Sequence, residues 1–195
     1  LEQSGITFGP ERVPQEAGLS PLTVTRDRES EAIVAQTLLG DVSREGENDV
    51  RHRYSSVQGT AEFSMNGTFS VRFQPGAWAK EHERSYEDAS QSCLERIDFQ
   101  GTLISSESGE RPGQTVLTYY QNWEGTPLFS CQVTLLWQDD TLLRMEGQRL
   151  SGTITSSSEE ETLSAATVLV RFLAGVTEGG FVCSRIDEMN AGYLI

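Results

Sequence analysis

Hydrophobic residues recur at helical spacing in two segments of the first half of the chain. In residues 27–39 the apolar positions are three or four apart, and the pattern stops at Gly40. Ser85, followed three residues later by Asp88, has the pattern of a capping box, and apolar residues continue on one face as far as Ile97. Both segments are predicted to be amphipathic helices with defined ends.

Two further helices are predicted near the C-terminus. Ser158 and the three glutamates that follow it form a stronger capping box, with the acids at the positive end of the helix dipole. The helix that they open is expected to end at Gly175, and a last short helix is expected to include Val182 and Met189.

Strands are predicted between the helices. Residues 129–137 alternate between apolar and mainly polar positions, which indicates a long strand with one buried face. An Asp-Asp turn at 139–140 leads into a strand over residues 141–149, with Leu143 and Met145 at alternate positions.

A hairpin and a further strand complete the predicted elements. Asn66-Gly67, flanked by Phe63 and Phe69, is a strong hairpin signal because both turn positions tolerate positive φ. The same asparagine begins an N-glycosylation acceptor pattern, but the hairpin turn explains these residues without an attached sugar. Residues 116–123 are predicted to form another strand.

One pattern occurs twice in the sequence. Each copy consists of a Tyr, four further residues, Gly-Thr, two further residues and Phe-Ser. A predicted helix precedes the strands in each copy. The glycine is expected to mark a bulge or tight bend between paired strands. We interpret the copies as two repeated units. The residues that define the repeat are Tyr54, Gly59, Phe63, Tyr120, Gly125 and Phe129.

The predicted fold class is α+β, with two repeated helix-plus-antiparallel-meander units and the helices packed on one face of antiparallel sheets. We expect an irregular N-terminal lead in residues 1–25, a first unit in 26–99 and a second in 100–175. Residues 176–195 are expected to hold a short helix and the start of a truncated further unit. Because the chain begins at Leu1, we expect an export or anchor segment to have been removed.

Composition and charge exclude several classes of protein. The chain has 195 residues, of which 36% are hydrophobic and 23% charged, as in a globular protein. No apolar run is long enough to span a membrane. The net charge is −14, divided evenly between the two halves of the chain, which argues against a nucleic-acid partner.

The cysteines and histidines do not form a recognisable metal-binding pattern. Cys93, Cys131 and Cys183 each fall on an apolar stripe and are interpreted as buried thiols, and an odd number allows at most one disulfide. Arginines on both sides of His52 are expected to disfavour its protonation and metal binding, and His82 lies in a charged, solvated loop. We predict no metal site and no cofactor.

Catalytic motifs are also missing from the sequence. It contains no nucleophile elbow, dinucleotide-binding loop or phosphate-binding loop. The pair Asp139-Asp140 is interpreted as a hairpin tip, and Glu159–Glu161 as first-turn acids. We therefore predict that the chain is not an enzyme. A carboxylate-dependent hydrolase is an alternative, and it would need a deep pocket around carboxylates with raised pKa values.

Three aromatic residues are candidates for binding a partner. Tyr119 and Trp123 are expected to lie on the face opposite to Tyr120, where they are exposed if no helix covers that face and buried if one does. Trp78, in the loop over residues 74–84, is the third candidate.

The second copy of the repeat carries a family resemblance. The segment from Tyr120 to Phe129 resembles one arm of YycH/YycI-type extracytoplasmic regulators and of the related PepSY-like modules. The resemblance continues through the long strand after it and the turn into 142–147. The segment from Ile186 to Tyr193 is similar to one that leads into another strand there. The resemblance implies an N-terminal membrane anchor, an outward-facing domain and a role in regulating a sensor kinase, without catalysis.

We expect a non-catalytic extracytoplasmic binding or regulatory module of a Gram-positive-type bacterium. Its partner would be a protein, either a membrane sensor kinase or a sister regulator, or else an envelope ligand. Contact with the membrane would occur only through an anchor absent from this chain. A peptidase inhibitor or pro-domain is the alternative, and it would need an extended loop at residues 74–84 or 105–114.

Overall fold

The computed structural model describes residues 7–8, 22–46, 50–156 and 185–186. Contacts divide the chain into two compact units. One combines Leu1–Thr23 with Ile154–Gly192, and the other combines Val24–Thr153 with Tyr193–Ile195. The second unit contains the helices and the large sheet described below. The helix predicted from Ser158 to Gly175 lies outside the described residues.

The first helix, α1 (Glu29–Leu39), ends where predicted and begins two residues later than the predicted start at Asp27. The Asp27 carboxylate accepts a hydrogen bond from the Glu29 N–H at 2.8 Å, which satisfies one of the amides left open at a helix start. Gly40 stops the helix with a φ of 73°, and its N–H donates to the Gln36 carbonyl at 2.8 Å.

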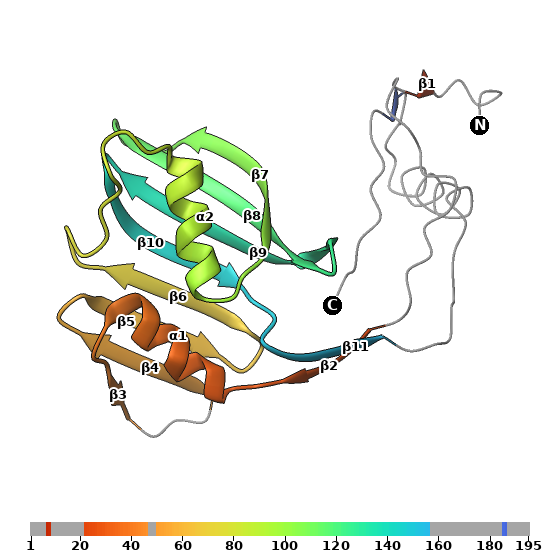
Figure 1. Ribbon diagram of the computed structural model, residues 1–195, viewed down its shortest axis with the longest axis horizontal. Coiled ribbons are helices and arrows are strands. Elements are labelled where there is room, and N and C mark those ends of the chain that lie inside the picture. Colours follow the sequence, from red (N-terminus) through yellow and green to blue (C-terminus); the bar gives the residue numbers. More distant parts are fainter. Residues whose placement is uncertain (1–6, 9–21, 47–49, 157–184, 187–195) are drawn as a thin grey trace, which may run out of the picture. The chain divides into compact units, whose positions relative to one another are not determined.

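The second helix, α2 (Tyr86–Arg96), is capped as its sequence predicts. The Ser85 hydroxyl accepts a hydrogen bond from the Asp88 N–H at 3.0 Å. Acids in the first turn and Arg96 in the last turn agree with the helix dipole. Both helices cover the same face of the sheet (Figure 1), as expected.

An antiparallel sheet of eight strands has the order β3-β4-β5-β6-β10-β9-β8-β7. Its strands are β3 (Ser43–Glu45), β4 (Arg51–Ser56), β5 (Gly59–Ser64), β6 (Thr68–Phe73), β7 (Gly101–Ser108), β8 (Gln114–Trp123), β9 (Thr126–Gln138) and β10 (Thr141–Gln148). Along the chain α1 precedes the first four strands and α2 precedes the last four, and the two sets meet where β6 pairs with β10. The α+β class is confirmed.

Two small strand pairs are also described. Strand β2 (Leu22–Arg26) pairs with β11 (Gly152–Ser156), and β1 (Thr7–Phe8) pairs in parallel with β12 (Arg185–Ile186). The short C-terminal helix predicted around these last two residues is therefore wrong at Arg185 and Ile186, because strand pairing there overrides the helical spacing of apolar residues.

The core lies between the helices and the covered face of the sheet. It is continuous across the pairing of β6 with β10. Its most buried large side chains come from α1, α2 and the inner strands, and they include Leu38, Leu39, Val71, Leu94, Phe99, Leu117, Val133, Leu135, Trp137, Leu142 and Met145. A core of this kind, shared by both helices, stabilises the sheet as one layer under them.

The predicted hairpins form, but one predicted face is wrong. Phe63 pairs with Phe69 across the Asn-Gly turn, and Gln138 pairs with Thr141 across the Asp-Asp turn. A bulge shifts the register after Leu142, so that Leu142 rather than Leu143 lies in the core with Met145. Leu143 points to the opposite face because the bulge adds one residue to β10.

The two copies of the sequence pattern fall on matching hairpins, β4–β5 and β8–β9, but their tyrosines differ. Tyr54 is buried under α1 with 5% exposure. A register shift after Tyr120 bulges the second hairpin, and Tyr120 packs edge-on against Phe129 with ring centroids 5.3 Å apart. Its neighbour Tyr119 takes the covered face instead. The repeat is therefore still an interpretation of the sequence.

Candidate functional site

Of the three candidate aromatic residues, Tyr119 lies in the core. Its side chain is 2% exposed, and its hydroxyl donates to the backbone carbonyl of Glu87 on α2 at 3.3 Å. Burial raises the pKa of this phenol to about 12. Of the two alternatives for Tyr119, the buried one holds, since α2 covers the face on which it lies.

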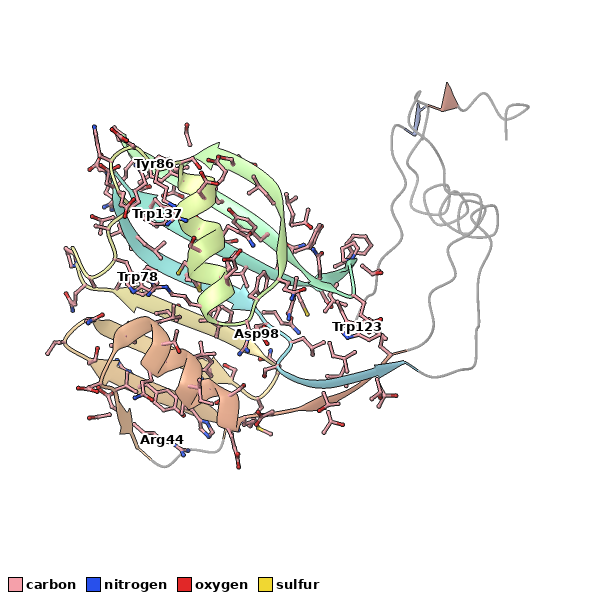
Figure 2. All side chains as sticks on the ribbon, viewed as in Figure 1. Arg44, Trp78, Tyr86, Asp98, Trp123 and Trp137 are labelled. Atoms are coloured by element: carbon pink, nitrogen blue, oxygen red, sulfur yellow. The ribbon has the colours of Figure 1, made fainter. Side chains whose placement is uncertain are left out.

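Trp123 and Trp78 lie in separate parts of the structure (Figure 2). Trp123 is half-buried at the end of β8, where it pairs in register with Thr126 in the next strand. Trp78 is half-buried in the loop between β6 and α2. The three candidate residues therefore do not form one surface.

Trp78 lines a hollow of about 460 Å³ between α1, α2 and the loop over residues 74–85, which we call the interhelical cleft. Trp78 and Trp137 contribute its aromatic wall. Its polar and small lining residues include Thr37, Gln58, Ala79, Lys80, Arg84 and Arg96. The size is within the usual range of ligand pockets.

Three contacts fix the position of Trp78. The indole N–H donates to the Leu38 carbonyl at the end of α1, with a distance of 2.8 Å. The ring lies 5.9 Å from the ring of Phe73, and the guanidinium of Arg96 lies 5.0 Å from the ring centroid. Since these partners belong to α1, β6 and α2, the indole is held in place at the cleft.

The loop that carries Trp78 is anchored to the β9–β10 hairpin. The N–H of Lys80 donates to the Asp140 carbonyl at 2.8 Å, and the N–H of Leu142 donates to the Trp78 carbonyl at 2.9 Å. The other segment that was a candidate protease-binding loop is a strand through Ser108 followed by a tight turn, in which the Gly109 N–H bonds to the Gln114 carbonyl. Neither segment is an extended loop.

Lys80 is the only lysine of the sequence, and its side chain is just 6% exposed. Its ammonium lies 2.8 Å from an Asp140 carboxylate oxygen and 4.9 Å from the centre of the Tyr86 ring. The hydrogen bond from Lys80 lowers the pKa of the Asp140 carboxyl. This direction is opposite to the one that a carboxylate-dependent hydrolase would need. His82 stands nearby, almost fully exposed, as predicted.

Two arginines of the cleft have no carboxylate partner among the ion pairs of the described residues. Arg84 donates to the backbone carbonyl of Asp88 at 3.1 Å and to the hydroxyl of Ser92. Arg96 has the ring contact with Trp78. The cleft thus presents guanidinium groups that are held by neutral partners and can still bind an anion.

A second hollow of about 460 Å³ lies on the face of the sheet opposite to the helices, and we call it the open-face hollow. Its floor consists of Val116, Leu136 and Leu143, and its rim includes Arg144, which pairs with Glu146. The lining also includes Glu110 and Arg111, so two acids and two arginines balance there, whereas three basic residues and one acid line the interhelical cleft.

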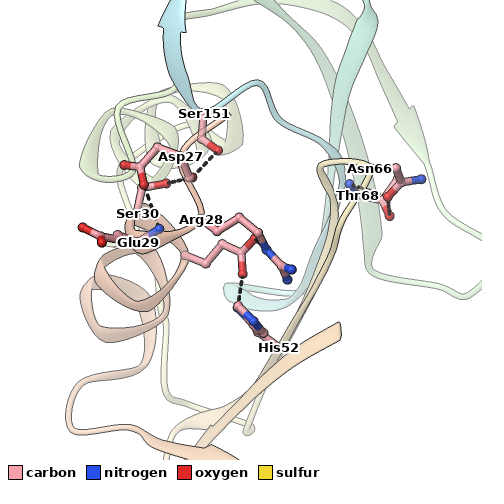
Figure 3. A network of polar contacts seen from close by, with 9 residues as sticks. Asp27, Arg28, Glu29, Ser30, His52, Asn66, Thr68 and Ser151 are labelled. Carbon is pink, nitrogen blue, oxygen red and sulfur yellow. Dashed lines mark hydrogen bonds and ion pairs between the residues drawn. The ribbon is translucent and has the colours of Figure 1, made fainter. Parts of the chain in front are cut away.

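Away from both hollows, Glu31 is a buried carboxylate of α1 held between two basic groups (Figure 3). One oxygen lies 3.1 Å from Nε of Arg28, and the other lies 2.6 Å from Nδ1 of His52 on β4. The arginines on both sides of His52 in the sequence point to the opposite face of the sheet, because successive residues of a strand alternate between faces, so the charged group that His52 contacts is the Glu31 carboxylate. This contact joins α1 to the sheet.

The same close-up shows how two turns are held. The N–H of Asp27 donates to the Ser151 carbonyl, and the Ser151 hydroxyl donates to the Asp27 carbonyl (Figure 3). The carboxamide oxygen of Asn66 accepts from both the N–H and the hydroxyl of Thr68. These bonds account for the Asn66 side chain within the hairpin turn itself.

The described cysteines are buried as predicted. Cys93 on α2 is 0% exposed and Cys131 on β9 is 1% exposed, whereas Cys183 lies outside the described residues. Burial raises the pKa of the Cys93 thiol to about 12. Within the described ranges no cluster of three His, Cys, Asp or Glu side chains could hold a metal ion, and no helix is long and apolar enough to cross a membrane.

Arg84 and Arg96 were not among the residues singled out from the sequence. A signal was present, since Asp88, Ser92 and Arg96 recur every four residues along one face of the predicted helix, and Arg84 continues this spacing just before the helix begins. What the spacing could not reveal is that this face borders Trp78, which comes from a loop whose position depends on the tertiary fold.

The fold and the cleft define an α+β domain with an eight-stranded antiparallel sheet, covered on one face by two described helices. No family model matches the chain, and no curated protein matches it. The structure is weakly similar to the Bacillus megaterium YpeB C-terminal domain, with a TM-score of 0.34 and 14% identity over 63% of this chain and 63% of that chain. The resemblance to the YycH/YycI type is not confirmed.

Proposed function

We propose that this chain is a non-catalytic binding module whose interhelical cleft takes a segment of a protein partner. The observation that carries the proposal is the placement of Trp78, a half-buried indole fixed by α1, β6 and α2 at the wall of a hollow. An aromatic side chain already held in place loses little conformational freedom when a ligand packs on it.

The other lining residues agree with a peptide ligand. Gln58, Thr37 and the arginines supply hydrogen-bond donors that can pair with peptide carbonyls or side chains. Tryptophan and arginine are also the residues most enriched among those that dominate the affinity of protein interfaces. A hollow of about 460 Å³ has room for a few residues rather than for a whole domain.

The wider setting is part of the same proposal. The module belongs to a membrane-anchored extracytoplasmic protein of a Gram-positive-type bacterium, and its partner is a sensor kinase or a sister regulator. The sequence resemblance of Tyr120–Phe129 supports this setting. The two helix-plus-meander units are copies of one repeat, which the identical order of elements around the β6–β10 pairing favours.

Selection of binders from a random peptide library, with the whole chain immobilised, tests the proposal. Peptides selected on the parent protein are re-tested on Ala79→Trp, in which an exposed residue of the interhelical cleft becomes large enough to fill it. Leu143→Trp is the matched control, because it places the same side chain in the open-face hollow.

We expect the selected peptides to lose at least tenfold in affinity on Ala79→Trp and to bind Leu143→Trp like the parent. The opposite result, with binding lost only on Leu143→Trp, would place the site on the other face of the sheet and overturn the proposal. Melting temperatures of both variants check that neither substitution unfolds the protein.

A further inference from the structure

The interhelical cleft concentrates positive charge in a chain whose net charge is −14. Lys80, Arg84 and Arg96 line it, and Glu81 is the one carboxylate residue among its described lining residues. A basic hollow in an acidic protein does not follow from composition, and it favours an anionic ligand over a neutral or cationic one.

The charge of Lys80 is already balanced, whereas the two guanidinium groups are not. The Lys80 ammonium pairs with Asp140 at 2.8 Å. Arg84 bonds to the Asp88 carbonyl and the Ser92 hydroxyl, and Arg96 stacks on Trp78. An arginine held by neutral acceptors keeps its charge uncompensated, so these two side chains are the groups that an anion would meet.

The conformation of Arg84 directs its guanidinium group along α2. Arg84 precedes α2, but its contact with Ser92 shows that the side chain runs along the helix towards Arg96. Ser92 and Arg96 are one turn apart on the same face, with side chains separated by about 6 Å. Both arginines therefore line the same cleft beside this face of α2, despite their separation in sequence.

We infer that the interhelical cleft binds an acidic peptide segment, with one carboxylate at Arg84 and a second at Arg96. In an extended peptide, side chains two residues apart point the same way at about 7 Å, so one short segment can offer a carboxylate to each arginine of the cleft. The hollow is much larger than one carboxylate, and Trp78 offers an apolar wall to the stem of an acidic side chain. This inference rests on the proposed function and specifies the ligand of the same site.

Calorimetric titration of the whole chain tests the inference with three probes. These are the peptide Ac-Glu-Leu-Glu-NH2, its neutral counterpart Ac-Gln-Leu-Gln-NH2 and inorganic phosphate. The protein variants are Arg84→Gln and Arg96→Gln, with Arg72→Gln as the matched control, since Arg72 is exposed on β6 and is not part of the cleft. Ala79→Trp is titrated in parallel as the variant that fills the cleft.

We expect the acidic peptide to bind at least tenfold more tightly than the neutral one. Each of Arg84→Gln and Arg96→Gln should weaken its binding by roughly three- to thirtyfold, between the effect of an exposed ion pair and that of a charge-assisted hydrogen bond, while Arg72→Gln changes it less than twofold. Binding should weaken as salt is added.

Three results would overturn the inference. Equal binding of both peptides, lost on Ala79→Trp, would keep the cleft as the binding site but reject an acidic ligand. Phosphate binding as tightly as the peptide would reduce the site to a simple anion site. Acidic peptide binding that Ala79→Trp leaves unchanged would reject the cleft itself, and with it the proposed function.

Discussion

At the scale of single residues, a buried thiol and a buried phenol link the stability of the fold to pH. Burial raises the pKa of Cys93 from its ordinary value of 9.0 to about 12, and that of Tyr119 from 10.0 to about 12, because it disfavours the charged form of each group. The folded state therefore holds both protons more tightly than the unfolded state does. The stability that this provides is fully present below pH 9 and is lost as the pH rises towards 12.

The variant Cys93→Ala should separate the two contributions. In the parent the free energy of unfolding should begin to fall above about pH 9, when the Cys93 thiol ionises only in the unfolded chain. Without this thiol the slope between pH 9 and 12 should be smaller by about 1.4 kcal/mol per pH unit. Urea titrations at several pH values from 8 to 11.5 measure the slope. Identical slopes in parent and variant would contradict the buried, neutral thiol.

Much of what single residues do was readable from the sequence. Ser85 begins α2 and Gly40 ends α1, each through a hydrogen bond to a residue three or four positions away in the chain. The local sequence pattern was therefore enough to predict both helix ends. Trp78 and Arg96 meet only because a loop and the end of a helix converge in space. Sequence spacing carries no information about such a meeting, and for this reason the cleft was not predicted although Trp78 was singled out.

At the scale of elements, the two glycines of the repeated pattern serve different structural needs. A Cβ atom on Gly59 would lie 2.1 Å from the backbone oxygen of Arg72 in the neighbouring strand. Gly125 has open space around it and a φ of 80° in the β8–β9 turn. One position requires close approach of two strands and the other requires only a left-handed backbone.

Alanine substitutions should therefore have unequal effects. Gly59→Ala should destabilise the protein by roughly 3 kcal/mol or more, because the β5–β6 pairing must open to admit the methyl group. Gly125→Ala should cost about 1–2 kcal/mol, the strain of a left-handed alanine. Asparagine, which tolerates that conformation better, should recover part of the loss at Gly125. Chemical denaturation measures all three variants, and equal losses at the two glycines would refute the assigned difference.

Strand pairing also set the limit of prediction at this scale. The period-two pattern placed β8, β9 and β10, because it depends on alternation along one strand, and the turn residues placed both hairpins. Strand β7, whose last residues lie in the candidate loop over 105–114, was not predicted. Bulges after Leu142 and after Tyr120 then changed which residues face the helices. A bulge is a property of two paired strands, so the pattern of either strand alone could not indicate it.

At the scale of the whole unit Val24–Thr153, the two sets of strands share one core. Each helix lies over its own side of the sheet, but buried residues continue from β6 to β10 without a break. Val71 and Met145, both 0% exposed, pair directly across this central junction. Neither side could unfold alone without exposing the apolar surface that it shares with the other.

The unit should consequently unfold in one cooperative step. Native-state hydrogen exchange should give the same free energy of opening for the slowest amides of β4 and of β9, which belong to opposite sides of the sheet. Val71→Ala should lower both values equally, by about 2 kcal/mol, because the cavity it creates lies in the shared core. Val57→Ala, at a side chain that is 94% exposed, is the matched control and should leave both unchanged. If Val71→Ala loosened β4 while the amides of β9 kept their protection, the two sides would be separate folding units, and the continuous core would not couple them.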